Sequence, residues 1–369
     1  LLRRTDLEIR LFVHSFGNSW GLVKEGLSPQ EVDILDNKTL SKALESCDVV
    51  VNATRGGGKV MIEGLKNLLH QSSRNGVRKF IHLSSVAIYG DFPSSDTTKE
   101  VSPSSTLEED GYGYLKLLQD ELVQKAHSSR GMQTLILCPP NITGPESPFL
   151  SSILTLMKLD KLALIDNGKQ PCCIVDVDNL ASAVESSIDT DKFSGDRLFI
   201  TNDSEISWKE LTDYLSDCIY NSKKLSNVNK EEVMKNLPKQ KKVVKSFRKT
   251  VKYLLSGQMR SMYLNDPILS HISRGLRSFV GNFKRLENFM RTSVKKKPKI
   301  SILELDKEFD WNPISTQMRG VWHSSSNAKT TINYSPNISS SESIINFCNW
   351  HNEMCGLKSD EWEFIDTID

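Results

Sequence analysis

The stretch RKFIHLSSVAIYGD, residues 78–91, joins a predicted strand to a turn that carries two serines. Its first half carries Phe80, Ile81 and Leu83, and we predict a strand over 78–85. Several of the predicted strands are near-continuous apolar runs, as expected for strands that are buried on both faces of a parallel sheet. Ligands bind outside the carboxyl ends of such strands. We therefore expect Ser84 and Ser85 to lie at the edge of a binding site.

The same pattern continues on both sides of this stretch. Short apolar runs alternate with helical stretches, an order that predicts an open, doubly wound α/β domain with a parallel sheet. No internal repeat is apparent. The predicted strands are 8–13, 47–53, 78–85, 133–140 and 196–201, and the predicted helices are 37–46, 59–76 and 114–129. The Ser/Asn-rich stretch 315–343 is predicted as a loop, and a closing helix is predicted to follow it.

The composition is that of a soluble globular protein, with 38% hydrophobic and 25% charged residues among 369. No run approaches the roughly 18 uncharged apolar residues that cross a bilayer. The opening residues resemble neither a signal peptide nor a transit peptide. The seven cysteines are scattered without CxxC spacing, which favours a reducing compartment and gives no indication of a metal site. The sequence predicts a cytoplasmic protein.

The segment 221–298 differs from the rest. It holds 20 Lys and Arg against 4 Asp and Glu, whereas the whole chain carries a net charge of +1. Two stretches within it, 241–255 and 266–292, place apolar residues at helical spacing beside basic ones. This basic insert has three interpretations: a helical lid over a pocket, a peripheral contact with an anionic membrane surface, or a contact in a homodimer. No motif supports nucleic-acid binding.

Residues 110–122, DGYGYLKLLQDEL, follow the two serines. On a helix Tyr112 and Lys116 lie one turn apart on the same face, whereas Tyr114 points elsewhere. A tyrosine pKa near 10 falls to about 7 only with roughly 4 kcal/mol of differential stabilisation. A neighbouring ammonium supplies part of that. The pair, with a serine nearby, suggests proton transfer at an alcohol oxygen.

Together HLSSVAIYGD and YGYLK resemble the extended short-chain dehydrogenase/reductase superfamily, in particular its NAD-dependent epimerase/dehydratase and 3β-hydroxysteroid dehydrogenase-like branches. The likeness covers about 8–219 and 299–354. It continues in order through VDILD (32–36), VVVNATRGGG (49–58), LCPPNITGPES (137–147), IVDVDNLASAVESSI (174–188) and LELDKEFDWNP (303–313). The resemblance implies a Rossmann-type fold and NAD or NADP as cofactor.

The resemblance also implies roles for individual residues. Ser85, Tyr112 and Lys116 would be the catalytic serine, tyrosine and lysine, and Lys116 would also bind the nicotinamide ribose. The adenine would meet Asp33 and Ile34, the ribose Ala53 and Thr54, and the nicotinamide Pro139 and Ile142. The full set of implied cofactor-binding residues is Asp33, Ile34, Ala53, Thr54, Ser84, Tyr112, Lys116, Pro139 and Ile142.

The sequence departs from the family pattern at four places. It opens on what resembles the end of the family's first helix, so the first strand and its glycine-rich phosphate turn are missing and we expect an incomplete sequence. His14 and Ser15 leave NAD and NADP both open. Gln170 stands where many nucleotide-sugar members carry an arginine. Val86 and Ala87 replace the Asp-Glu that follows the serine in many dehydratases, which disfavours dehydration.

We predict a nucleotide-binding domain over 1–219, the basic insert over 220–298 and a substrate-domain segment over 299–369. The small C-terminal part, about 140–219 with 299–354, would build the substrate pocket. The expected function is NAD(P)-dependent oxidoreduction or epimerisation of a sugar-like substrate, possibly a nucleotide sugar, or of another alcohol. A catalytically silent cofactor-sensing or membrane-associated scaffold of the same fold is the alternative.

Overall fold

The computed structural model describes residues 4–18, 22, 27–103, 107, 111–219, 225–237, 299–302 and 307–365. The chain divides into two compact units, one formed by Leu1–Asn227 with Ser315–Asp369 and the other by Val228–Ile314. Most of the basic insert, including both amphipathic stretches, lies outside the described residues. The predicted boundaries at 219/220 and 298/299 therefore stay predictions.

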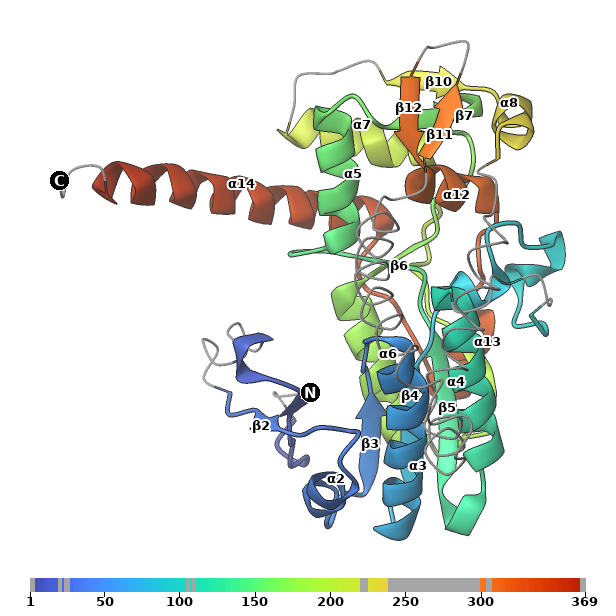
Figure 1. The fold of residues 1–369 in the computed structure, drawn as a ribbon, viewed down its shortest axis with the longest axis vertical. Helices are drawn as coiled ribbons and strands as arrows, with labels where there is room; N and C mark the ends of the chain where they lie inside the picture. The colour runs from blue at the N-terminus through green and yellow to red at the C-terminus, as the bar shows by residue number, and fades with distance from the viewer. Residues whose placement is uncertain are drawn as a thin grey trace, which may run out of the picture. The chain divides into compact units, whose positions relative to one another are not determined.

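A central sheet of four parallel strands organises the first unit (Figure 1). Each strand lies within a range that the sequence predicts as a strand, so the parallel α/β fold is confirmed. The register places Ile81 opposite Leu135, in the middle of the sheet. In spatial order the strands are β3 (Val49–Asn52), β4 (Lys79–Leu83), β5 (Gln133–Cys138) and β9 (Arg197–Phe199).

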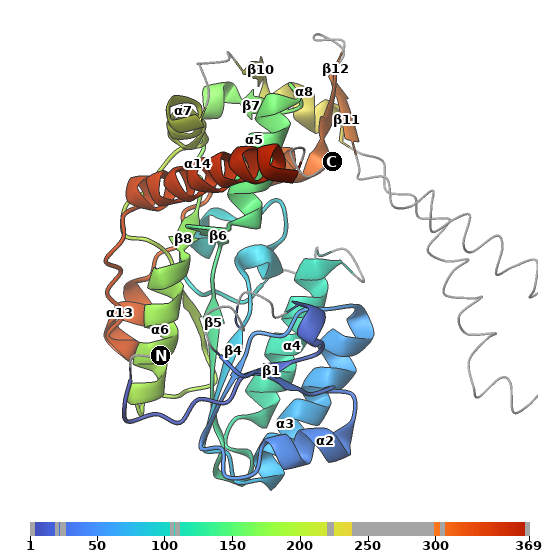
Figure 2. The same cartoon turned by 90° about the vertical axis from the view of Figure 1, so that its left-hand side faces the viewer.

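Helices cover both faces of this sheet (Figure 2). One face carries the π-helical turn η2 (Val60–Gly64), α3 (Leu65–Arg74) and α4 (Tyr112–Ala126), with α2 (Asn37–Ala43) beside α3. The other carries α6 (Val177–Asp189) and α13 (Ser326–Ile332).

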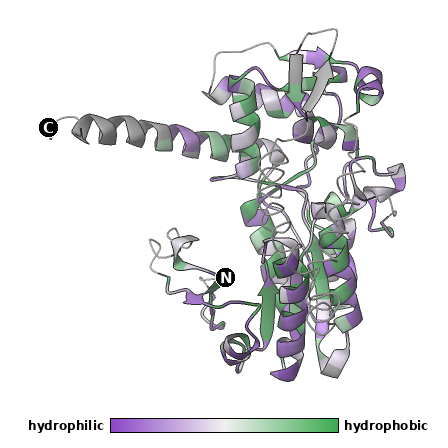
Figure 3. Cartoon of the chain, in the orientation of Figure 1, coloured by the Kyte–Doolittle hydropathy of each residue, from purple (hydrophilic) through white to green (hydrophobic). Residues whose placement is uncertain are grey.

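Strand residues alternate between the two faces. Phe80 joins a buried cluster with Leu65 and Val123, whereas Ile81 joins a cluster with Leu180 and Ala183. Strand β5, which is coloured as apolar in Figure 3, is buried from Thr134 to Cys138.

The N-terminal strands do not extend the central sheet. The strands β1 (Phe12–Val13) and β2 (Gln30–Glu31) pair in parallel with each other and form a separate two-stranded sheet. Among the described residues, β3 has no strand partner on the side away from β4. A short 3₁₀ turn, η1 (Phe16–Asn18), follows β1.

The part of the first unit after residue 140 builds a second core. It contains the strands β6 (Asn141–Thr143), β7 (Ala163–Ile165) and β8 (Ile174–Asp176), of which β6 and β8 pair in parallel. The helices α5 (Pro148–Lys158), α7 (Trp208–Ile219) and α14 (Ser340–Ile365) bury Leu154, Trp208 and Phe347 in one cluster.

Short 3₁₀ turns complete the first unit: η3 (Val86–Tyr89), η4 (Ser95–Thr98), η5 (Ser129–Gly131) and η6 (Asp166–Gly168).

Asp176 caps α6, as its position before an apolar helical stretch predicts. Its carboxylate accepts the backbone N–H of Asp178 at 2.8 Å and the hydroxyl of Ser343. Ser343 also shares a hydrogen bond of 2.7 Å with Thr143. This buried chain ties α14 to β6 and to the start of α6.

The second unit contains α8 (Lys230–Lys235) and an antiparallel pair, β11 (Lys299–Ile302) with β12 (Lys307–Asp310). The last residue of β10 (Ser226–Val228) is the first residue of this second unit. The helix α12 (Trp311–Arg319) begins inside the unit and ends beyond it. None of the described helices is both long and apolar enough to cross a membrane.

The prediction of a loop over 315–343 is wrong. The second half of α12 and all of α13 fall within this range, and α14 begins in it. The stretch SNAKTTI has few apolar residues, but Ala328 and Ile332 are both buried in the cluster that covers the sheet. Tertiary packing therefore stabilises a short helix that propensity alone does not indicate.

Candidate active site

Three neighbouring strands end at one edge of the central sheet. Ala53 and Thr54 follow β3, Ser84 and Ser85 follow β4, and Pro139 follows β5. The sequence-predicted residues of these three segments therefore share one edge. Ala53 is exposed, Thr54 is half-buried, and Ser84 and Pro139 are buried.

Ser85 leaves β4 in an extended conformation and caps the 3₁₀ turn η3. Its hydroxyl oxygen accepts the backbone N–H of Ala87 at 3.2 Å. A serine favours this position because its side chain can satisfy an N–H that the first turn of a helix leaves free. The cap fixes the direction of the side chain, whose hydroxyl lowers the pKa of Tyr112.

Tyr112 is the first residue of α4. Its neighbour Gly113 lies so close to η3 that an added Cβ would be 2.2 Å from the carbonyl oxygen of Ala87. Only glycine permits this approach, which brings the start of α4 beside the Ser85 turn. Tyr112 remains 44% exposed, so a ligand at the sheet edge can reach its hydroxyl.

The electrostatic environment of Tyr112 has opposing parts. Partial burial raises the pKa of Tyr112 above its ordinary value, and the carboxylate of Asp120 acts in the same direction. The guanidinium of Arg55 and the hydroxyl of Ser85 lower that pKa. The guanidinium carbon of Arg55 lies 5.6 Å from the centre of the phenol ring.

Lys116 lies one turn further along α4 and is only 4% exposed. Its ammonium donates a hydrogen bond of 2.7 Å to the carbonyl oxygen of Leu83, the last residue of β4. Burial lowers the pKa of Lys116 to about 8, although Asp120 favours the charged form. The side chain therefore connects α4 to the end of the strand that precedes the two serines.

Asp120 occupies the next turn of α4 and is fully buried. One of its carboxylate oxygens accepts a hydrogen bond of 2.6 Å from Nε of Arg197. The other lies 3.9 Å from Nε2 of His82, which is beyond hydrogen-bond distance. Burial raises the pKa of Asp120, and Arg197 opposes that increase.

The remaining predicted residues lie in other surroundings. The carboxylate of Asp33 accepts the N–H of Leu35 at 2.8 Å in a turn, and the carbonyl of Ile34 accepts the side-chain amide of Asn67 at 3.1 Å. Ile142 lies on β6, 38% exposed. The structure thus brings Ser84, Ser85, Tyr112 and Lys116 together, whereas Asp33, Ile34 and Ile142 are on separate elements.

The surroundings of the edge fit a nicotinamide dinucleotide. Tyr112 is 44% exposed at this edge and offers the kind of aromatic surface that a planar ring can cover. Lys116 has three donor hydrogens and gives one to Leu83.

Two features that lie at this edge are absent from the sequence-based prediction. Arg55 belongs to RGGGK, which reads as a simple strand-to-helix connection, and the structure places it in such a connection before η2. Asp120 follows Lys116 at the i+4 position, which is the signal that could have identified it. Its burial depends on Arg197, 77 residues away, and no local pattern indicates that pair.

Comparisons with solved structures find the same fold at low sequence identity. UDP-glucuronic acid 4-epimerase from Bacillus cereus in complex with NAD is 17% identical, with a TM-score of 0.62 over 96% of this chain and 93% of that chain. UDP-glucose 4-epimerase from Thermotoga maritima with UDP-glucose is 15% identical, with a TM-score of 0.55 over 90% and 86%. RMD from Pseudomonas aeruginosa complexed with NADPH is 14% identical, with a TM-score of 0.52 over 94% and 100%.

A comparison with curated proteins finds no match. The model of the NAD dependent epimerase/dehydratase family matches residues 9–197, which is more than half of the chain. That range contains the strands β3, β4 and β5 of the central sheet, the two serines and the helix with Tyr112 and Lys116. The protein therefore belongs to the NAD dependent epimerase/dehydratase family and is an enzyme of the type that uses a nicotinamide dinucleotide.

Proposed function

We propose that this enzyme oxidises and reduces, or epimerises, the alcohol carbon of a sugar-like substrate, with Tyr112 as the acid–base group. The observation that carries the proposal is the close approach of Tyr112 at the start of α4 to the Ser85 turn at the carboxyl edge of the sheet, with Lys116 buried one turn behind it. Two hydroxyls held together at an open edge can both contact one substrate oxygen. Family membership does not favour a catalytically silent scaffold.

Each residue has a separate part in the proposed reaction. Ser85 donates a hydrogen bond to the substrate oxygen and orients it. The Tyr112 phenolate takes the hydroxyl proton as the carbon–hydrogen bond of the same carbon breaks. The bound nicotinamide dinucleotide accepts or returns the hydride. In the reverse direction Tyr112 returns the proton to the oxygen of the ketone.

Lys116 holds the geometry and contributes charge. It fixes α4 to Leu83 through its ammonium, and its remaining donors are suited to the hydroxyls of a ribose. Ala53, Thr54, Pro139 and Ile142 would contact other parts of the cofactor, and Asp33 and Ile34 would meet the adenine.

For the substrate we propose a sugar-like alcohol, including nucleotide sugars. The structurally similar epimerases from Bacillus cereus and Thermotoga maritima act on UDP-glucuronic acid and UDP-glucose. Gln170 in place of an arginine leaves the diphosphate contact to other residues, of which the adjacent Lys169 is exposed. Val86 and Ala87 after Ser85 favour hydride transfer without dehydration.

The decisive test is Tyr112→Phe, with Tyr114→Phe as the matched control. Both changes remove one phenolic hydroxyl from the same turn of α4. We expect Tyr112→Phe to lower turnover at least about 100-fold and to leave NADH or NADPH affinity, measured by fluorescence titration, nearly intact. Tyr114→Phe should behave as the wild type.

Turnover would be followed with NAD and NADP on a panel of UDP-sugars, free sugars and simple alcohols, with products identified by NMR. Unchanged turnover in Tyr112→Phe would contradict the assignment of the acid–base residue. Turnover of simple alcohols without turnover of any sugar would contradict the proposed substrate class.

A further inference from the structure

Arg55 lies over the ring of Tyr112, on the connection that leaves β3. Its guanidinium carbon is 5.6 Å from the ring centre, within the range at which a cation interacts with an aromatic face. Arg55 comes from a different strand end than either serine and from outside α4. A second element of the fold therefore supplies a cation to the residue proposed to move the proton.

Hydrogen bonds hold the backbone immediately before Arg55. The side-chain oxygen of Asn52, at the end of β3, accepts both the backbone N–H of Thr54 at 3.2 Å and its hydroxyl at 2.8 Å. The amide nitrogen of Asn52 is 2.9 Å from Nδ1 of His82 on the neighbouring strand. The residue that immediately precedes Arg55 is thus fixed to the sheet.

The ammonium of Lys116 is engaged elsewhere. It donates to the carbonyl oxygen of Leu83, and with a pKa of about 8 it is partly neutral at mildly alkaline pH. A guanidinium stays charged throughout that range. Arg55 therefore remains a cation under conditions in which Lys116 loses its proton.

We propose that Arg55 is a positioning residue for the reaction: its guanidinium, stacked on Tyr112, stabilises the phenolate and supplements Lys116 in that task. This inference rests on the proposed role of Tyr112. The other groups that act on Tyr112 are the Ser85 hydroxyl from the end of β4 and the carboxylate of Asp120 on its own helix. Asp120 disfavours the phenolate, so Arg55 also counters that carboxylate.

The test compares Arg55→Gln, Arg55→Lys and Lys59→Gln. Lys59 is an exposed cation four residues along the same connection, so its change removes the same charge from the same segment. The pKa of Tyr112 would be measured on the free protein from the phenolate absorbance, as the difference between each protein and its Tyr112→Phe version. This readout needs neither substrate nor cofactor.

We expect Arg55→Gln to raise the pKa of Tyr112 by roughly 0.5 to 1 unit, the size of a charge effect over this distance in a partly aqueous site. Arg55→Lys should restore most of the shift, and Lys59→Gln should not change it. Because the exposed guanidinium is screened by salt, the difference should shrink at high ionic strength. In alcohol oxidation the acidic limb of the kcat/KM profile should move to higher pH by the same amount.

Equal pKa values in wild type and Arg55→Gln would overturn the inference. If the chain unfolds before Tyr112 titrates, the acidic limb decides in the same way. Weaker NADH binding or a higher KM without a shifted limb would also overturn it, since Arg55 would then bind an anion. Failure of the proposed function is separate, because it would appear as turnover that survives Tyr112→Phe.

Discussion

The two ends of strand β4 differ in how completely their polar groups are paired. At the amino end, Lys79 donates to the carbonyl oxygens of Ile188 at 2.9 Å and Thr190 at 2.6 Å, and it pairs with Asp191 at 3.1 Å. At the carboxyl end, His82 Nε2, Ser84 Oγ and Asp120 Oδ1 are buried without a hydrogen-bond partner among the described residues. Strand β4 thus connects a region whose polar groups are paired to a region in which buried polar atoms have no hydrogen-bond partner among the described residues.

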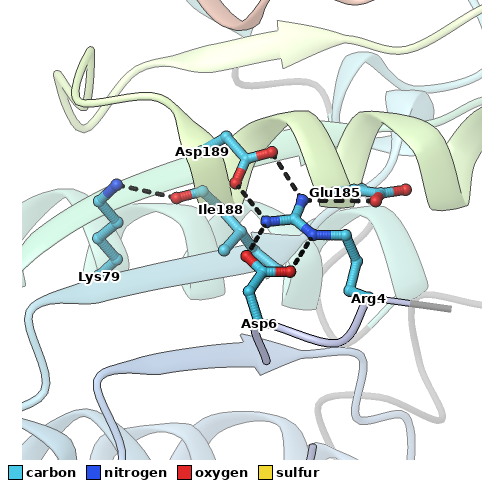
Figure 4. A network of polar contacts seen from close by, with 6 residues as sticks. All are labelled: Arg4, Asp6, Lys79, Glu185, Ile188 and Asp189. Carbon is cyan, nitrogen blue, oxygen red and sulfur yellow. Dashed lines mark hydrogen bonds and ion pairs between the residues drawn. The ribbon is translucent and has the colours of Figure 1, made fainter. Parts of the chain in front are cut away.

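The amino end follows the rules of helix termini. The last carbonyls of α6 have no partner within the helix and carry partial negative charge, so a half-buried lysine is favoured there. Arg4 strengthens the same region with a fork to Asp6 and Asp189 (Figure 4). Each of these contacts pairs a cation with an acceptor.

The carboxyl end combines burial with displaced protonation equilibria. Burial lowers the pKa of Lys116 to about 8 and raises that of Asp120. Buried polar atoms without partners cost stability, and perturbed pKa values gather at functional sites. The difference teaches that the first end of β4 stabilises the fold, whereas the second end keeps buried polar atoms without partners beside the proposed site.

We expect the largest loss of stability from Asp120→Ala, because it removes one partner of the buried Asp120–Arg197 ion pair at the carboxyl end of β4. The change leaves Arg197, whose side chain is 11% exposed, without its carboxylate. Removing one partner of a buried ion pair costs about 3–5 kcal/mol of unfolding free energy. Urea unfolding would measure the loss. Asp48→Ala is the control, since the Asp48–Arg78 pair is exposed at 69% and 76% and should contribute under about 1 kcal/mol. Similar losses in the two variants would show that burial is not the cause.

Gly113→Ala tests the carboxyl end of β4 by a change of geometry alone, because it adds no charged or polar group. A Cβ at 2.2 Å from the Ala87 carbonyl forces α4 away from η3 and separates Tyr112 from Ser85. A displacement of about 1 Å can lower kcat/KM roughly 100-fold, while overpacking costs about 1–3 kcal/mol. Steady-state kinetics with a parallel unfolding curve would separate the two effects. Wild-type kinetics in this variant would mean that the close contact does not position Tyr112.

Lys79→Met tests the amino end and should have the smallest effect. It removes the cation from the end of α6 and leaves two carbonyls without this donor, for an expected loss of about 1–2 kcal/mol. The kcat/KM of the remaining folded enzyme should be unchanged, because Lys79 lies at the opposite end of the strand from Ser85. Arg78→Met at the adjacent exposed position is the control for stability. A lower kcat/KM at full folding would show that the two ends are coupled.

The sequence predicts features that depend on local patterns and misses features that depend on contacts between distant residues. The strands and the Tyr112–Lys116 helix follow from hydrophobic period and helical spacing, which are local properties. Arg55, Gly113 and Asp120 depend on contacts with Tyr112, Ala87 and Arg197, which only the folded chain brings close. The helix α13 was missed for the same reason, since its two buried residues gain their partners from the sheet cluster.

The tie between Asn52 and His82 has a consequence for the pH dependence of the enzyme. Two donors from Thr54 fix the oxygen of Asn52, so its amide nitrogen donates to Nδ1 of His82 and leaves the imidazole proton on Nε2. Burial and the nearby Lys116 hold the pKa of His82 well below its ordinary value. His82, which lies beside the site, therefore stays neutral and does not titrate near pH 7. An inflection near neutrality in the rate profile would therefore not belong to His82.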